Sequence, residues 1–136
     1  MLKKNNTIVK KIASICKSEP AIAAAYIFGS HAKGSQKKSS DLDVALLLNE
    51  TKLADFFTLD FLTVLEKKLA CKADVVILNK AGEVMKFEVR RKGILVFERS
   101  KKDRKKFEIK GRKFYEDFLY LHKRYVKSVL YGNTHG

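Results

Sequence analysis

Apolar residues follow two different spacings along the chain, which predicts a protein of mixed helices and strands. Ile8, Ile12 and Ile15 recur at helical spacing among lysines, whereas 21–28 is an uninterrupted apolar run typical of a buried strand. Extended to the whole chain, the same patterns predict helices at 7–18, 51–70, 83–92 and 102–130, and strands at 21–28, 41–48, 73–78 and 94–98. We expect one α/β (α+β) domain over residues 1–136, with a core at about 20–98 and a small mixed sheet of about four strands flanked by α-helices.

The second predicted strand alternates in a way that assigns its residues to two faces. Leu42, Val44, Leu46 and Leu48 fall on one face, and Asp41, Asp43, Ala45 and Leu47 on the other. The helix after it is expected to be capped by Thr51. Two aspartates therefore belong to an otherwise apolar strand, which is an unusual place for carboxylates without a function.

The last predicted helix is amphipathic. Its apolar residues Phe114, Phe118, Leu121, Tyr125 and Val129 are three or four positions apart, and we expect this stripe to pack on the domain's own sheet. Gly111 weakens the helix or marks a break in it. The opposite side is mostly basic, so it is expected to bind an acidic protein partner or RNA, or only to be solvated.

Composition adds a strong charge bias to this picture. The net charge is +14, and residues 101–136 hold eleven Lys or Arg against four Asp or Glu, which indicates a polyanionic ligand or an acidic partner. No stretch is apolar and long enough to be a signal peptide or to span a bilayer, so we expect a cytoplasmic protein without a membrane partner. Cys16 and Cys71 are expected to be reduced.

Candidate chemistry gathers around the loop between the first two strands. Gly29 allows a sharp turn after the first strand, and Ser30 can cap a short helix whose backbone N–H groups suit a triphosphate. Asp41 and Asp43 lie two apart on a strand, so their carboxylates project from one face and suit Mg²⁺. Asp74 begins the next strand and would lie beside Asp43 if the two strands pair.

Two common binding-loop motifs do not fit these residues. The phosphate-loop spacing from Gly29 to Gly34 is not followed by Lys and Ser or Thr, and a calcium loop opening at Asp41 lacks its glycine and its final glutamate. A structural alternative stays open, in which Asp41 caps a turn and Asp43 pairs with a lysine.

The motif Gly29-Ser30, ten residues, Asp41-Leu42-Asp43 resembles the signature of the DNA polymerase beta nucleotidyltransferase superfamily. The short chain resembles the minimal nucleotidyltransferase (MNT) branch, the antitoxins that partner HEPN-domain toxins. The resemblance covers about residues 20–98 and implies the nucleotidyltransferase fold.

The resemblance also implies roles for individual residues. Gly29 and Ser30 match the residues that hold the NTP phosphates. Asp41 and Asp43 match catalytic metal ligands, and Asp74 matches the third catalytic carboxylate and metal ligand. Lys33 matches a nucleotide-binding position at which many relatives have arginine. Lysine keeps the positive charge of arginine there but lacks its planar, forked guanidinium group.

The resemblance predicts an enzyme, a Mg²⁺-dependent nucleotidyltransferase that moves AMP from ATP to an acceptor hydroxyl. It implies that the acceptor is a tyrosine of a cognate HEPN ribonuclease toxin, so that the chain acts as a protein adenylyltransferase and antitoxin. Two alternatives remain: the catalytic subunit of a small-molecule or RNA nucleotidyltransferase, and a non-enzymatic basic binding module with structural carboxylates.

Overall fold

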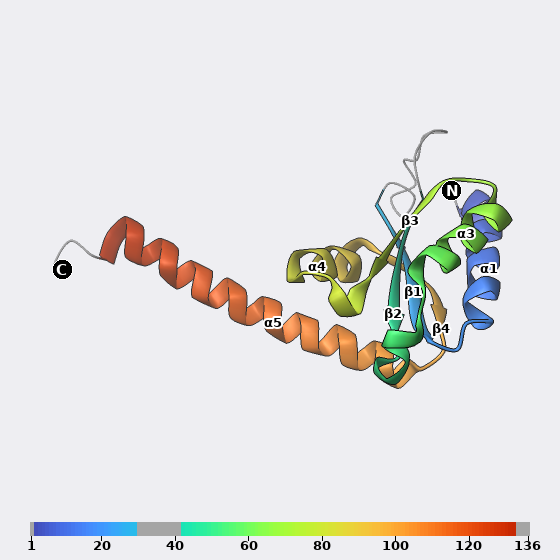
Figure 1. Cartoon of the computed structure of the whole chain (residues 1–136). Coiled ribbons are helices and arrows are strands. Elements are labelled where there is room, and N and C mark those ends of the chain that lie inside the picture. The colour runs from blue at the N-terminus through green and yellow to red at the C-terminus, as the bar shows by residue number, and fades with distance from the viewer. Residues whose placement is uncertain (1, 30–41, 133–136) are drawn as a thin grey trace.

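The computed structural model describes residues 2–29 and 42–132. The elements are, in chain order, α1 (Leu2–Lys17), β1 (Ile22–Phe28), β2 (Leu42–Leu48), the 3₁₀ helix η1 (Glu50–Asp55), α3 (Thr58–Leu69), β3 (Ala73–Ile77), the 3₁₀ turn η2 (Leu78–Lys80), α4 (Glu83–Lys92), β4 (Ile94–Glu98), α5 (Lys101–Lys127) and the π-helical turn η3 (Ser128–Gly132). Figure 1 shows a compact body from which α5 projects as a long arm.

The four strands form one mixed sheet in the order β3-β2-β1-β4. β1 lies antiparallel to both β2 and β4, whereas β2 and β3 are parallel and are connected through α3. This arrangement confirms the expected α+β class and the four predicted strands. β3 and β4 are the edges of the sheet, so β1 and β2 are paired on both sides.

Helices cover both faces of the sheet, and each face has its own apolar core. One core joins α1 and α3 to Leu42, Val44, Leu46 and Leu48 of β2. The other joins α4 and the start of α5 to Ala45 and Leu47. The predicted alternation along β2 is therefore confirmed where the structure describes it, and it assigns Asp43 to the face that carries α4 and α5.

Arg99, just after β4, closes the end of α1. Its Nη2 donates to the carbonyl oxygens of Cys16 at 3.0 Å and Lys17 at 2.8 Å, and its Nε donates to Ile22 O at 3.0 Å. Carbonyls at a helix end have no partner within the helix, so one guanidinium satisfies several at once.

Burial raises the pKa of the nearby Cys16 thiol to about 12. Cys71 is half-buried, and the described residues contain no disulfide between them.

The predicted helix at 51–70 is wrong as a single element, because the chain forms η1 and then α3. The expected cap at Thr51 is wrong as well. Asn49 is the capping residue, and its Oδ1 accepts a hydrogen bond from Thr51 N at 2.9 Å. Phe56 leaves helical geometry to pack on the core beside Phe61, with ring centroids 5.7 Å apart. The apolar rhythm continues through this break, which is why the sequence pattern concealed it.

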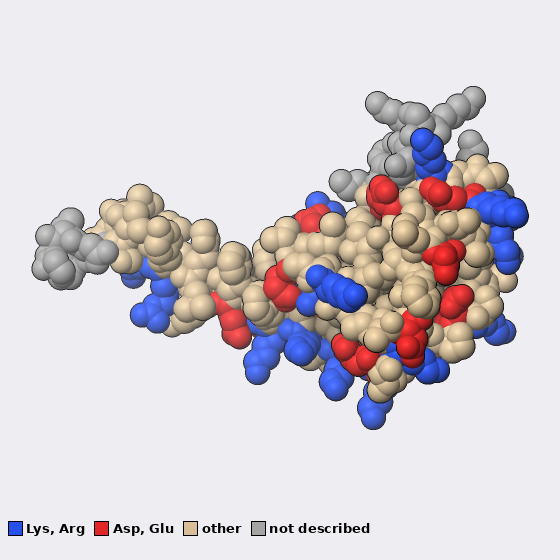
Figure 2. All heavy atoms as spheres, in the orientation of Figure 1, with Lys and Arg blue, Asp and Glu red and all other residues tan. Residues whose placement is uncertain are grey.

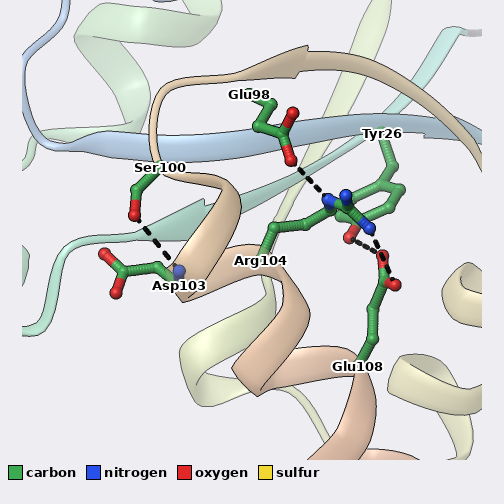
Figure 3. A network of polar contacts seen from close by, with 6 residues as sticks. All are labelled: Tyr26, Glu98, Ser100, Asp103, Arg104 and Glu108. Carbon is green, nitrogen blue, oxygen red and sulfur yellow. Dashed lines mark hydrogen bonds and ion pairs between the residues drawn. The ribbon is translucent and has the colours of Figure 1, made fainter.

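A polar network fixes the base of α5 to the sheet (Figure 3). Arg104 lies between two carboxylates, donating to Glu98 Oε1 at 2.6 Å and to Glu108 Oε1 at 3.0 Å. The buried Tyr26 hydroxyl of β1 donates to Glu108 Oε2 at 2.9 Å. Burial and then this hydrogen bond raise the pKa of Tyr26, and the two carboxylates raise the pKa of Arg104. The direction in which α5 leaves the body is thus held by charge-assisted hydrogen bonds.

The prediction that the stripe on α5 packs on the domain's own sheet is wrong from Phe114 onward. Phe107 packs against the core and Gly111 is buried, but Phe118 and Tyr125 are 52% and 66% exposed. Gly111 does not break α5, which runs unbroken from Lys101 to Lys127. Within the described residues, no helix is sufficiently long and apolar to cross a membrane.

Candidate active site

Gly29 and Asp43 meet where β1 ends and β2 begins. Phe28, the last residue of β1, is the register partner of Asp43, and Gly29 follows it with φ of +73°. A Cβ added to Gly29 would overlap with the Asp43 carboxylate, which approaches it through Oδ2. Glycine is therefore required twice, for its left-handed backbone and for the space that the carboxylate occupies.

Asp74 stands directly opposite Asp43 across the parallel β2–β3 pair. Residues paired in this way project from the same face of a sheet whose strands lie about 4.8 Å apart. Asp43 is half-buried and Asp74 is exposed on the edge strand. The expected pairing of the two strands is confirmed, and it brings the two carboxylates side by side.

Local contacts hold this end of the two strands in place. Leu42 N donates to Lys72 O at 3.0 Å, which ties the start of β2 to the residue before β3. Glu66 of α3 accepts a hydrogen bond from Ala73 N at 2.8 Å, so α3 fixes the first residue of β3. The sequence analysis did not identify Glu66, because no motif or spacing in the sequence connects it with the candidate site residues.

Gly29, Asp43 and Asp74 are the predicted site residues that can be located. Ser30, Lys33 and Asp41 lie outside the described residues. Within residues 2–29 and 42–132, no three carboxylate, histidine or cysteine side chains gather closely enough to hold a metal ion. The described part of the chain contributes two adjacent carboxylates, one of which approaches Gly29. Such hard oxygen donors fit Mg²⁺.

A separate groove lies at the other end of the same sheet face. It has a volume of about 620 Å³ and is lined by Leu47, Leu78, Phe107 and Phe114, with charged residues at its rim. Leu47 is four residues from Asp43 along β2, or about 13 Å at the rise of a strand. Neither carboxylate of the pair lines this groove, so it is distinct from the candidate metal site.

The fold and the paired carboxylates have the form of a nucleotidyltransferase domain, and comparison with known proteins agrees. Residues 10–102 match the family described as polymerase beta, nucleotidyltransferase. Because this match spans most of the chain, the protein belongs to that family. No curated protein sequence matches the chain.

Several solved structures with similar folds are toxin–antitoxin complexes. A chain of a toxin–antitoxin with AMP-PNP has a TM-score of 0.71 at 23% identity, covering 90% of this chain and 98% of that one. A chain of the tri-AMPylated Shewanella oneidensis HEPN toxin in complex with MNT antitoxin has a TM-score of 0.67 at 20% identity, covering 93% and 98%. A chain of the toxin–antitoxin MntA–HepT has a TM-score of 0.63 at 20% identity, covering 92% and 98%.

Proposed function

We propose that this protein is a cytoplasmic, Mg²⁺-dependent nucleotidyltransferase that moves AMP from ATP to a tyrosine hydroxyl of a HEPN-family toxin, and so acts as an antitoxin. The observation that carries the proposal is the carboxylate pair, in which Asp43 stands opposite Asp74 with Gly29 against it. Two carboxylates side by side on one face of the sheet supply the hard oxygen ligands that Mg²⁺ prefers, so the arrangement favours a metal-assisted reaction.

Each site residue has a part in this reaction. Asp43, with Asp41 and Asp74, would hold Mg²⁺, which when bound neutralises charge on the phosphate oxygens. Gly29, together with Ser30 after it in the chain, would bind the triphosphate, and Lys33 would supply positive charge to it. The tyrosine oxygen forms a bond to the α-phosphorus as the bond to the bridging oxygen breaks. Pyrophosphate leaves with the electron pair, and the hydroxyl proton passes to Asp74 or to water.

The relatives support both the nucleotide and the acceptor. One similar structure holds AMP-PNP, an ATP analogue, and another contains a tri-AMPylated HEPN toxin beside its MNT antitoxin. Both chains have folds similar to that of this protein at under 25% identity. RNA and small molecules are the alternative acceptors.

A labelling experiment tests the proposal. The protein is incubated with α-³²P-ATP and Mg²⁺ together with its cognate HEPN toxin in a ribonuclease-inactive form, and in parallel with total RNA. We expect label on a toxin tyrosine, located by mass spectrometry, and none when EDTA replaces Mg²⁺. Asp43→Asn should abolish the label, while Asp55→Asn, an exposed aspartate at the end of η1, should leave it unchanged. Label on RNA alone, or full transfer by Asp43→Asn, would contradict the proposal.

A further inference from the structure

The apolar stripe of α5 continues past the edge of the domain. Its residues stand three or four positions apart: Phe107, Gly111, Phe114, Phe118, Leu121, Tyr125 and Val129. The first two lie within the body, and the other five are exposed. Spacings that alternate between three and four are typical of a seam between two packed helices. The domain therefore uses the inner part of one seam and leaves the outer part uncovered.

Stacked rings connect the uncovered part to the body. Phe87 of α4 stacks on Tyr115 with ring centroids 3.9 Å apart, Tyr115 lies 6.4 Å from Phe118, and Phe118 lies 5.9 Å from His122. Because Phe87 belongs to α4, this row is fixed to the body at its inner end. A partner would meet a surface whose side chains are already ordered, which lowers the entropic cost of binding.

Positive charge lies beside the inner end of this seam. Arg90, Arg91 and Arg112 line a small cavity between α4 and α5, together with Glu108. The four further Lys or Arg of residues 113–131 lie on the side of α5 opposite the stripe. In Figure 2 the projecting arm is largely uncharged along its upper side, while lysines and arginines gather along its lower side. A protein that covers the seam meets the three arginines beside α4, and therefore needs acidic residues at that end of its own apolar contacts.

We propose that residues 114–131 are the docking surface for the acceptor toxin, which presents an apolar helix flanked by acidic side chains. This inference rests on the proposed function, because it takes the acceptor to be a protein. The toxin helix would lie along α5 beside α4, with its apolar residues between Phe118 and Tyr125. Its carboxylates would face Arg90, Arg91 and Arg112.

Two other occupants fit less well. A second copy of this chain would bring the same excess of positive charge against itself. A membrane would have to lie flat along the stripe, but the inner part of the same stripe is buried against the body. The body therefore stands on the apolar side of α5 and would keep a flat bilayer away from it. A single protein helix needs only the exposed part of the stripe beyond Gly111.

Binding of the ribonuclease-inactive toxin to the full chain tests this surface. Phe118→Glu and Tyr125→Glu should each raise the Kd at least about tenfold, as expected for an aromatic residue central to an interface. Tyr120→Glu is the matched control, since Tyr120 lies on the opposite side of the same helix and is 62% exposed. It should change the Kd less than about threefold. Circular dichroism and ATP affinity should be unchanged in all three variants.

The outcomes separate this inference from the proposed function. Asp43→Asn should abolish AMP transfer and leave the toxin Kd unchanged. A wild-type chain that binds the toxin through Phe118 but transfers no AMP would contradict only the proposed function. Equal effects of Tyr120→Glu and Tyr125→Glu would overturn the docking surface. The docking surface would also be overturned if Phe118→Glu left toxin binding unchanged but abolished self-association in sedimentation. The same holds if Phe118→Glu left toxin binding unchanged but abolished binding to phosphatidylserine vesicles.

Discussion

Asp43 of β2 and Asp74 of β3 are direct partners in a parallel strand pair, and both are second in their strands. Side chains alternate along a strand, so a slip of one residue would send Asp74 to the opposite face. The buried Ala73 and the partly buried Val75 and Ile77 pack with the α1 and α3 core and prevent this slip. The core on one face of the sheet thus fixes the carboxylate pair on the other.

The first prediction concerns a metal shared by these carboxylates. Asp74→Asn removes one of the two charged oxygen ligands that the described residues offer to Mg²⁺. Saturating Mg²⁺ should raise the melting temperature of the wild type but not of this variant. Thermal melts with Mg²⁺ and with EDTA measure the effect, and an equal Mg²⁺ response in the two proteins would contradict a shared metal.

A second prediction compares two glycines. Gly29→Ala should lower the free energy of unfolding by about 1–2 kcal/mol, since alanine must adopt a positive φ and its Cβ displaces the Asp43 carboxylate. It should also reduce AMP transfer more than tenfold by moving that carboxylate. Gly82→Ala is the control: its φ is −71°, and a Cβ there would meet nothing within 4 Å. Gly82 caps α4, and alanine is the poorer cap but also restricts the unfolded chain, so the opposing effects should keep the change in unfolding free energy below about 1 kcal/mol. Similar losses in both variants, measured by urea denaturation, would refute the close contact.

Local signals account for the parts of the fold that the sequence predicted correctly. The strict alternation along β2 assigned both faces of that strand and put Asp43 on the correct one. Gly93 separates the predicted helix at 83–92 from the strand at 94–98, and a Cβ there would overlap with Val89 O. In both cases the interactions that determine the structure join residues close together in the chain, so a single sequence is sufficient to predict them.

Non-local contacts account for what the sequence could not predict. The stripe on α5 shows that one side of the helix is apolar, but the pattern is the same whether that side meets the sheet or a partner. Arg99 closes α1 from 82 residues away, and Tyr26 bonds Glu108 across the same separation in the chain. In the candidate site, Asp74 lies beside Asp43 only because β2 and β3 are neighbours in the sheet. No spacing in the sequence specifies that strand order.

A third prediction concerns the alkaline stability of the protein. At pH 7, Tyr26→Phe should lower the free energy of unfolding by about 1 kcal/mol, because the hydrogen bond to Glu108 is lost. The folded-state pKa of Tyr26 is raised by burial and by that hydrogen bond, while an unfolded tyrosine titrates near about 10. The stability from Tyr26 is therefore fully present below that unfolded-state pKa and declines as the pH rises above it.

Urea denaturation from pH 7 to 11 measures this effect as the difference between wild type and variant. The difference should shrink above pH 10. The control Tyr125→Phe changes an exposed ring on α5 and should match the wild type at neutral pH. A wild-type advantage that stays constant up to pH 11 would show that Tyr26 ionises equally in the folded and unfolded chains.

The last prediction concerns Gly111 and Arg90, whose contact joins α5 to α4. In an ordinary helix, replacing glycine by alanine raises the free energy of unfolding by about 1 kcal/mol. Here the Cβ would overlap with the Arg90 guanidinium, which lies 5.9 Å from the Phe107 ring centroid. Gly111→Ala must push Arg90 away from that ring and should give no gain. In an Arg90→Ala background the obstacle is absent, and the same change should stabilise the protein by about 1 kcal/mol. A double-mutant cycle by urea denaturation then yields a coupling of about 1 kcal/mol or more. An equal gain in both backgrounds would mean that Arg90 does not pack on Gly111.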